Sequence, residues 1–135
     1  GFGVRMATLK GYPVAIITGG RSGSINKRFL SCGVEAEDIY LGSRDKIVDF
    51  DHFCKKYSLS PDEVLYVGDD IPDIPVINAC GIGACPSDAT EEVKETCDFI
   101  SSKPGGRGCV REVVEKVMKT KGDWVFDVAG YKAKF

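Results

Sequence analysis

Five short apolar stretches recur along this chain, separated by segments whose apolar residues have helical spacing. They occupy residues 14–17, 38–41, 64–67, 81–84 and 99–100. The first, Val-Ala-Ile-Ile, is wholly apolar and ends at Thr18, Gly19 and Gly20, as expected for a strand buried on both faces of a sheet. We therefore predict five short strands in a sheet that has helices on each side.

The intervening segments predict five helices. They cover residues 24–32, 45–57, 73–79, 90–96 and 107–119. Gly33 caps the first of them, and Ser60 caps a turn that precedes the third strand. The last helix carries apolar side chains on one side, at Val110, Val113, Val114 and Val117. Alternating strands and helices with short loops predict an α/β fold, a doubly wound parallel sheet in a single domain over residues 1–135.

Length and charge exclude several classes of protein. The 135 residues are enough for one domain with one core. Eighteen basic and 20 acidic residues give a net charge of −2, so we predict no nucleic-acid partner, although a local basic pocket for a small phosphate is allowed. No apolar run approaches the roughly 20 residues of a membrane helix, and Arg5 interrupts the start, where a signal peptide is apolar. The sequence predicts a cytoplasmic protein with no membrane partner.

Cysteine and histidine offer little chemistry. The six cysteines are dispersed, and no pair has the Cys-x-x-Cys spacing of zinc or redox sites. We predict that they are reduced and mostly buried, as in the cytoplasm. The single histidine, His52, falls in a predicted helix, which argues against a Ser-His or Cys-His catalytic pair.

Distinctive polar groups follow three of the predicted strands. Thr18 ends the first, Lys46 comes soon after the second, and Asp69 and Asp70 end the third. In a doubly wound sheet, ligands bind beyond the carboxyl ends of the strands. Each group alone is compatible with an ordinary turn or a solvated side chain, but their order predicts one common site.

The carboxylates of this site predict a metal ion. Asp69, Asp70 and Asp73 are unfavourable to cluster unless a cation shares the site. Oxygen ligands without histidine or thiolate favour Mg²⁺, which takes one or two carboxylates and completes its shell with water and substrate phosphate.

The remaining groups of the site predict phosphate binding. The Thr18 hydroxyl and the backbone amides of Gly19 and Gly20 can donate hydrogen bonds to phosphate oxygens. Lys46 can neutralise the negative charge that remains during phosphoryl transfer.

Four segments also match a known set of motifs. They are residues 14–21 (VAIITGGR), 42–46 (GSRDK), 66–73 (YVGDDIPD) and 105–112 (GGRGCVRE). The first three resemble the second, third and fourth motifs of the haloacid-dehalogenase superfamily. The last is similar to the glycine-rich stretch before the final helix of its small capless 3-deoxy-D-manno-octulosonate 8-phosphate phosphatases. The resemblance covers roughly residues 1–124 and implies a Rossmann-like, capless domain.

The resemblance implies a role for each matching side chain. Thr18 binds the transferring phosphoryl group, and Lys46 steadies the nucleophile and the phosphate. Asp69 is a direct Mg²⁺ ligand, while Asp70 and Asp73 support the metal and the lysine.

The resemblance also bears on substrate and assembly. Arg107 is implied to contact the carboxylate of a sugar-acid substrate, although an exposed arginine beside a glycine-rich loop needs no such role. The substrate implied is an eight-carbon or nine-carbon keto-acid phosphate, and a homotetramer is usual in this subfamily. The C-terminal tail, residues 122–135, either lies over an active site or is a frayed end.

The superfamily's first motif, Asp-x-Asp-Gly, is absent from this chain. Its aspartates supply the nucleophile and the general acid and base, on a central strand upstream of a segment like residues 1–6. Asp49 and Asp51 have the right spacing but fall in a predicted helix. The chain is therefore either a piece of a longer protein or an inactive relative. A missing central strand leaves backbone groups unpaired at roughly 1–3 kcal/mol each, which favours the first explanation.

These patterns predict a magnesium-dependent phosphatase that uses an upstream aspartyl-phosphate. The implied substrate is 3-deoxy-D-manno-octulosonate 8-phosphate, an intermediate of lipopolysaccharide biosynthesis. A receiver-like signalling domain combines similar groups, but it places its acidic pair first, whereas here Thr18 and Lys46 precede Asp69. A third hypothesis is an inactive oligomerisation module, which an upstream Asp-x-Asp motif would exclude.

Overall fold

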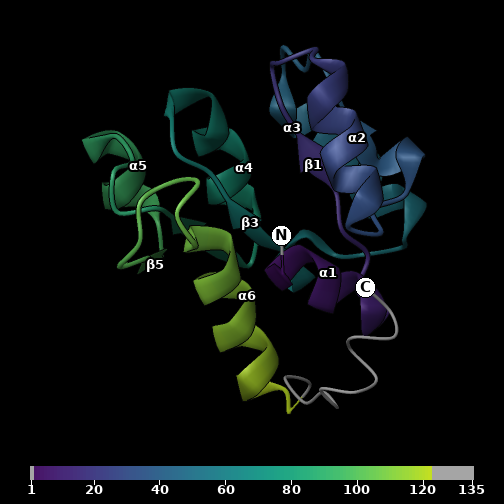
Figure 1. Ribbon diagram of the computed structural model, residues 1–135. Helices are drawn as coiled ribbons and strands as arrows, with labels where there is room; N and C mark the ends of the chain where they lie inside the picture. Colours follow the sequence, from purple (N-terminus) through teal and green to yellow (C-terminus); the bar gives the residue numbers. More distant parts are fainter. Residues whose placement is uncertain (1, 123–135) are drawn as a thin grey trace.

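Helices and strands alternate along most of the chain in the computed structural model, which describes residues 2–122 (Figure 1). The strands are β1 (Ile16–Ile17), β2 (Ile39–Tyr40), β3 (Leu65–Val67), β4 (Ile82–Cys85) and β5 (Phe99–Ile100). The helices are α1 (Phe2–Leu9), α2 (Gly23–Ser31), α3 (Lys46–Lys56), α4 (Ile74–Ala79), α5 (Glu91–Thr96) and α6 (Cys109–Thr120). Short 3-10 turns precede β2, β3 and α4. Across residues 2–122, every helix is too short or too polar for a membrane crossing.

The strands pair in parallel and form two separate sheets. β1 pairs with β2, with Ile16 opposite Ile39. β3, β4 and β5 form a second sheet in that order, with Leu65 opposite Ile82. Within the described residues, β1 and β3 make no strand pairing with each other. Figure 1 shows β1 with α2 and α3 on one side of the molecule, and β3 with α4 on the other.

Helices cover both faces of the three-stranded sheet, because successive side chains of β3 point to opposite faces. Leu65 and Val67 pack in the cluster that includes α6 residues, whereas Tyr66 packs against the cluster formed by α3 and α4. Ile17 of β1 packs on this second cluster, which is centred on Phe50. α3 and α4 therefore give the two sheets a shared core.

α1 packs on α6 and was not predicted from the sequence. Met6 and Ala7 of α1 meet Met118 of α6 in a buried cluster. Gly3 allows this approach, since a Cβ there would lie 2.8 Å from the Arg111 Cα. Glycine is a poor helix former, so the local sequence gives a weak signal here and packing on α6 stabilises the helix.

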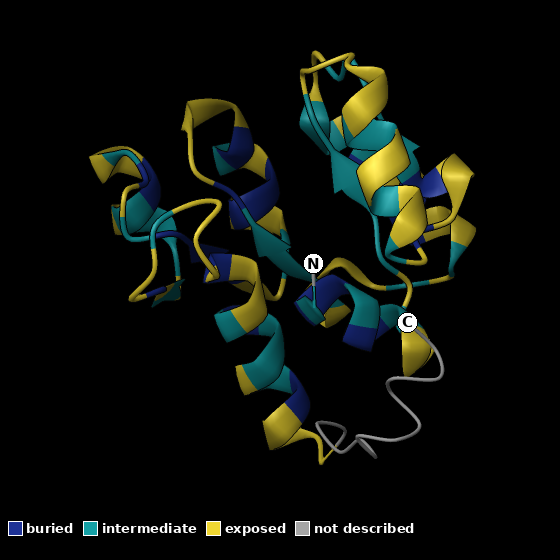
Figure 2. Cartoon of the chain, in the orientation of Figure 1, coloured by how far each residue is buried: buried dark blue, intermediate teal, exposed yellow. Residues whose placement is uncertain are grey.

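Burial differs between the strands (Figure 2). In β4, Ala84 and Cys85 have no exposed surface, whereas the residues of β1 and β3 are only half-buried. α2 contains no buried residue at all. The prediction that residues 14–17 form a strand buried on both faces is wrong, because β1 is only half-buried.

The α/β fold and the order of the predicted elements are confirmed, with ends that shift by one or two residues. Gly33 follows α2 with a φ of +89°, in the left-handed region that favours glycine. Ser60 forms a capping box with Glu63 before β3. On α6, Val113 is buried as predicted, but Val110 is 42% exposed, so the apolar face of that helix is narrower than predicted.

His52 lies in a helix as predicted, whereas the prediction of mostly buried cysteines holds for only three of the six. All six cysteines are free, and Cys54, Cys85 and Cys109 are buried. His52 is an exposed residue of α3, where its Nδ1 and the Tyr40 hydroxyl share a hydrogen bond of 2.8 Å. Asp49 and Asp51 lie in the same helix, as predicted. The predicted C-terminal tail falls almost wholly on residues 123–135, outside the described residues.

Candidate active site

Backbone hydrogen bonds join the loops that follow β1 and β2. The Ser43 N–H donates to the Thr18 carbonyl at 2.9 Å, and the Gly42 N–H donates to the Gly20 carbonyl at 2.8 Å. Lys46 begins α3 shortly after these contacts. Thr18 and Lys46 therefore belong to adjoining loops at the carboxyl ends of neighbouring strands.

An ion pair connects this region to the loop after β3. Lys46 Nζ donates to Asp73 Oδ1 at 2.7 Å, and the two side chains are only 17% and 3% exposed. The other oxygen of Asp73 accepts from the backbone N–H groups of Asp69, at 3.0 Å, and Asp70, at 3.2 Å. The structure thus brings together four of the predicted site residues from two sheets.

Asp73 is buried and yet ionised. Burial opposes its charge, but hydrogen bonds from Lys46, Tyr66 and the Asp69 N–H hold the pKa of Asp73 below its ordinary value. Gly68 permits the close packing of this side chain, since a Cβ at Gly68 would lie 2.5 Å from the Asp73 Cβ. The buried Asp73 carboxylate therefore fixes the backbone that follows β3 through its hydrogen bonds.

The Asp69 carboxyl lies at the exposed end of β3, next to the negative charge of Asp73. Desolvation, followed by the negative charge of Asp73, raises the pKa of Asp69, so a nearby cation would favour its ionised form. Asp70 Oδ1 instead accepts from the Ile71 N–H at 2.7 Å and caps the turn that begins there. Within residues 2–122 no three His, Cys, Asp or Glu side chains form a ready metal cluster. Mg²⁺ needs only one or two carboxylates beside water and phosphate, so these residues fit it.

The Thr18 side chain is oriented by its own loop. The Gly20 N–H donates to Thr18 Oγ1 at 3.1 Å. Because this bond uses a lone pair of the oxygen, the hydroxyl hydrogen is left to donate to a ligand. Gly19 and Gly20 are exposed at this rim, which is compatible with the predicted phosphate contact.

Arg107 lies in the loop between β5 and α6. It is exposed, and its N–H donates to the Pro104 carbonyl at 3.1 Å. The neighbouring Gly105 N–H donates to Asp88 Oδ1 at 2.8 Å, which ties this loop to the one after β4. The contact of Arg107 with a substrate carboxylate stays a prediction.

Tyr66 belongs to the site and was missed in the sequence analysis. Its hydroxyl donates to Asp73 Oδ1 at 2.6 Å, the same oxygen that binds Lys46. The signal was present in the sequence, because Tyr66 is the one residue with a polar tip in the predicted strand of residues 64–67.

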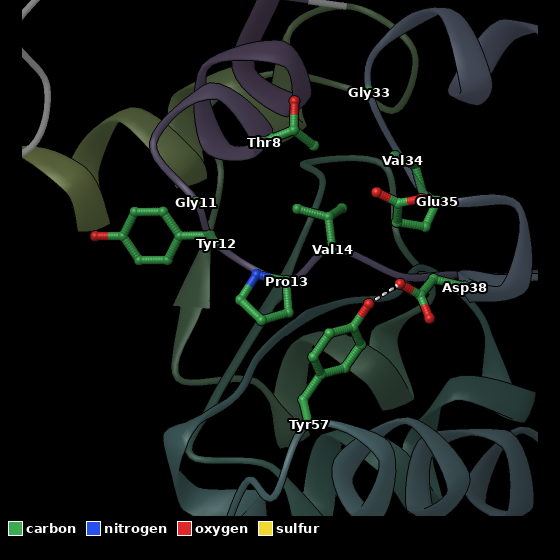
Figure 3. A pocket seen from close by; sticks show the side chains of 10 residues that line it. All are labelled: Thr8, Gly11, Tyr12, Pro13, Val14, Gly33, Val34, Glu35, Asp38 and Tyr57. Atoms are coloured by element: carbon green, nitrogen blue, oxygen red, sulfur yellow. Dashed lines mark hydrogen bonds between the residues drawn. The ribbon is translucent and has the colours of Figure 1, made fainter.

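A pocket of about 230 Å³ lies at the opposite ends of β1 and β2 (Figure 3). Its lining includes Pro13 and Val14, which precede β1, and Asp38, which precedes β2. Asp38 is 1% exposed and accepts hydrogen bonds from Lys56, at 2.7 Å, and from the Tyr57 hydroxyl. This pocket therefore contains none of the predicted site residues.

The structure thus places a hydroxyl, an ammonium group and carboxylates at the carboxyl ends of parallel strands, where α/β folds bind their ligands. In agreement, the chain belongs to the haloacid dehalogenase-like hydrolase family, whose pattern matches residues 21–111. The predicted resemblance is confirmed at this level, and it excludes the receiver-like alternative as the family of this chain.

Comparison with individual proteins indicates a narrower group within this family. The 3-deoxy-D-manno-octulosonate 8-phosphate phosphatase of Escherichia coli (strain K12) is 33% identical over 122 residues, which cover 90% of this chain and 64% of that protein. The crystal structure of the phosphatase of that name from Yersinia pestis has a TM-score of 0.86 at 30% identity, and covers 90% of this chain and 64% of its own. The chain therefore spans about 64% of the length of the curated relatives it matches.

A third relative was crystallised with ligands. It is the 3-deoxy-D-manno-octulosonate 8-phosphate phosphatase from Moraxella catarrhalis in complex with magnesium ion, phosphate ion and a KDO molecule. Its TM-score is 0.87 at 29% identity, over 99% of this chain and 74% of that one. The resemblance to this subfamily, predicted from four motifs, is thus confirmed in sequence and in fold.

Proposed function

We propose that the full protein is a magnesium-dependent phosphate monoester hydrolase that acts on a keto-deoxy sugar-acid phosphate, with 3-deoxy-D-manno-octulosonate 8-phosphate as the first candidate. The observation that carries the proposal is the Lys46–Asp73 pair of 2.7 Å, which sets an ammonium group beside the Asp69 loop. The similarity to 3-deoxy-D-manno-octulosonate 8-phosphate phosphatases supports the substrate class, and the Moraxella catarrhalis complex supports the metal.

The residues of this chain would bind and neutralise the phosphoryl group. The Thr18 hydroxyl, already an acceptor for the Gly20 N–H, donates to a phosphoryl oxygen. Lys46 offsets the negative charge that develops as the phosphoryl group is transferred. Asp73 holds the Lys46 ammonium group in place through the hydrogen bond of 2.7 Å.

Asp69 would hold Mg²⁺, which supplies positive charge next to the phosphoryl group when it is bound. Asp70 and Asp73 act on the loop: Asp70 caps the turn at Ile71, and Asp73 accepts from two backbone N–H groups. A loop that is fixed by three such hydrogen bonds keeps Asp69 in one orientation, as a metal ligand requires.

We assign the nucleophile to an upstream strand that lies between β1 and β3, so that residues 1–135 and this strand form one domain. β1 and β3 are not paired with each other, yet Ile17 and Tyr66 pack on the same cluster around Phe50. β1 and β3 are both only half-buried, which leaves surface of both strands for such a strand to cover. It would also satisfy the free backbone groups of both strand edges.

The test is hydrolysis of 3-deoxy-D-manno-octulosonate 8-phosphate, and of a nine-carbon analogue, by the full-length protein at saturating Mg²⁺. Lys46→Ala and Asp69→Ala should each lower turnover by about 100-fold or more, because each removes charge stabilisation from the transition state. Lys55→Ala, an exposed lysine of the same helix, is the control and should retain full turnover.

Two results would count against the proposal. Full turnover in both site variants would refute the assignment of the site, and a wild-type protein without phosphatase activity would favour the inactive oligomerisation module. The homotetramer and the cytoplasmic location stay predictions, which the molecular mass in solution and cell fractionation would test.

A further inference from the structure

The Tyr66 hydroxyl lies directly against the ion pair of the candidate site. Tyr66 Oη donates to Asp73 Oδ1 at 2.6 Å, and Lys46 Nζ donates to the same oxygen at 2.7 Å. Neither the motifs nor the relatives assign a role to this tyrosine. Tyr66 belongs to β3 of the three-stranded sheet, whereas Lys46 follows β2 of the other sheet. The oxygen of Asp73 that both residues bind therefore connects the two sheets.

The Asp73 carboxylate is saturated by four donors. Tyr66 and Lys46 occupy Oδ1, and the backbone N–H groups of Asp69 and Asp70 occupy Oδ2. A carboxylate offers about four acceptor positions, so none is left for water. Each donor therefore restrains the orientation of Asp73, and the loss of one leaves a buried charge less completely bonded.

Tyr66 is itself held rigidly. Its ring packs between two buried clusters, one centred on Phe50 and Val76 and the other on Ile77 and Cys85. Burial, and then the hydrogen bond to Asp73, raise the pKa of Tyr66, so the phenol stays protonated and remains a donor. A neutral donor on a fixed ring is suited to hold a carboxylate in one place.

We propose that Tyr66 is a positioning residue, which orients Asp73 and through it fixes the Lys46 ammonium at the phosphoryl site. The catalytic consequence rests on the function proposed above, whereas the structural consequence does not. Tyr66 does not touch the substrate, so its hydroxyl should matter for kcat and leave substrate binding almost unchanged.

The experiment compares Tyr66→Phe with Tyr40→Phe in the full-length protein. Phenylalanine keeps the ring and its packing, and Tyr40 is a matched control because its hydroxyl bonds His52, away from the Lys46–Asp73 pair. In Tyr66→Phe we expect kcat to fall about tenfold with KM changed less than about twofold, as for other residues that orient a metal or phosphate ligand. Tyr40→Phe should leave both values unchanged.

A second measurement does not depend on turnover. The rate at which an amine-reactive reagent acylates Lys46, relative to the exposed Lys55 of the same helix, is read from peptide masses. Without the Tyr66 hydroxyl, Asp73 and Lys46 are less restrained, and this ratio should rise at least about threefold. If wild-type protein shows no phosphatase activity, the proposed function fails, and the labelling ratio alone decides the role of Tyr66. An unchanged ratio, or a higher KM at unchanged kcat, would overturn the proposal.

Discussion

β4, the middle strand of the three-stranded sheet, is packed far more completely than either strand of the two-stranded sheet. Ala84 in β4 and Val93 in α5 have no exposed surface, whereas β1 is half-buried and α2 has no buried residue (Figure 2). The candidate active site nevertheless draws on both regions. Thr18 and Lys46 come from the loosely packed side, and Asp73 comes from the tightly packed one.

The difference shows what holds Lys46 in place. Its own sheet contributes little, but α3, which begins at Lys46, is anchored in the shared core by Phe50, only 1% exposed. The far end of α3 is fixed by the hydrogen bond of 2.7 Å between Lys56 and the buried Asp38. A helix held along its length presents its first residue in a defined position, even where the neighbouring strands are incompletely covered.

The largest expected effect comes from completing the sheet. A chain extended at its N-terminus by an apolar strand with the Asp-x-Asp motif should be more stable by at least about 3 kcal/mol, because unpaired buried backbone groups cost ~1–3 kcal/mol each. Urea unfolding of the extended and the 135-residue chains measures this difference.

Hydrogen exchange gives the same prediction a local readout. In the extended chain the amides of β1 and β3 should gain protection, whereas those of β4, already paired on both sides, should change little. Equal protection of β1 in the two chains would mean that the added strand does not lie between the sheets, and the contrast between the two regions would need another cause.

Two alanine substitutions compare how much a side chain of α6 and a side chain of α2 contribute to the free energy of unfolding. Met118→Ala removes a side chain that is 2% exposed and packs on α1, and should lower the free energy of unfolding by about 2–4 kcal/mol. Leu30→Ala, in α2, removes one that is 41% exposed, and its effect should stay below about 0.5 kcal/mol. Similar losses in urea unfolding would show that α2 is buried in solution and would remove the contrast.

Most of the fold could be predicted because its signals are local. Apolar runs such as residues 64–67, a glycine at the end of α2 and a capping box at Ser60 mark element ends independently of the rest of the chain. α1 could not be predicted in this way, because its stability comes from contact with α6, more than a hundred residues away. The division of the five strands into two sheets could not be predicted either. It depends on which strands pair, and the local sequence of a strand does not specify its partner.

The site was predictable in its members but not in its connections. Thr18, Lys46 and Asp69 follow strands, so the strand order alone predicts that they lie at the carboxyl ends of parallel strands. Asp73 accepts from four donors, and Tyr66 is one of them. These contacts form only because β3 and the start of α3 come together in the folded chain. The spacing of residues along the sequence does not contain that information.

In both regions a serine in the loop before a helix donates a hydrogen bond to an acidic side chain in the first turns of that helix. In the two-stranded region Ser43 donates to Asp49 Oδ2 at 2.6 Å. In the three-stranded region Ser102 donates to Glu112 Oε2 at 2.7 Å, and its N–H to Oε1 at 3.2 Å. Each acid is the fourth residue of its helix, where a negative charge also favours the helix dipole.

The smallest expected effect is the pH dependence of this contact in α6. The hydrogen bonds from Ser102 lower the pKa of Glu112 from its ordinary value of 4.5. A carboxyl whose pKa is lower in the folded than in the unfolded state stabilises the fold above 4.5, and this stabilisation is lost as the pH falls through the folded value. Glu112→Gln should therefore be less stable than wild type at about pH 7 and equal to it at about pH 3.

Urea unfolding at the two pH values measures this difference, and Glu115→Gln, on the same helix without a contact to Ser102, controls for the loss of one negative charge from α6. The interaction is exposed, so the shift in midpoint should be small beside that of Met118→Ala. A deficit of Glu112→Gln that persisted unchanged at low pH would mean that the glutamate acts through packing rather than through its charge.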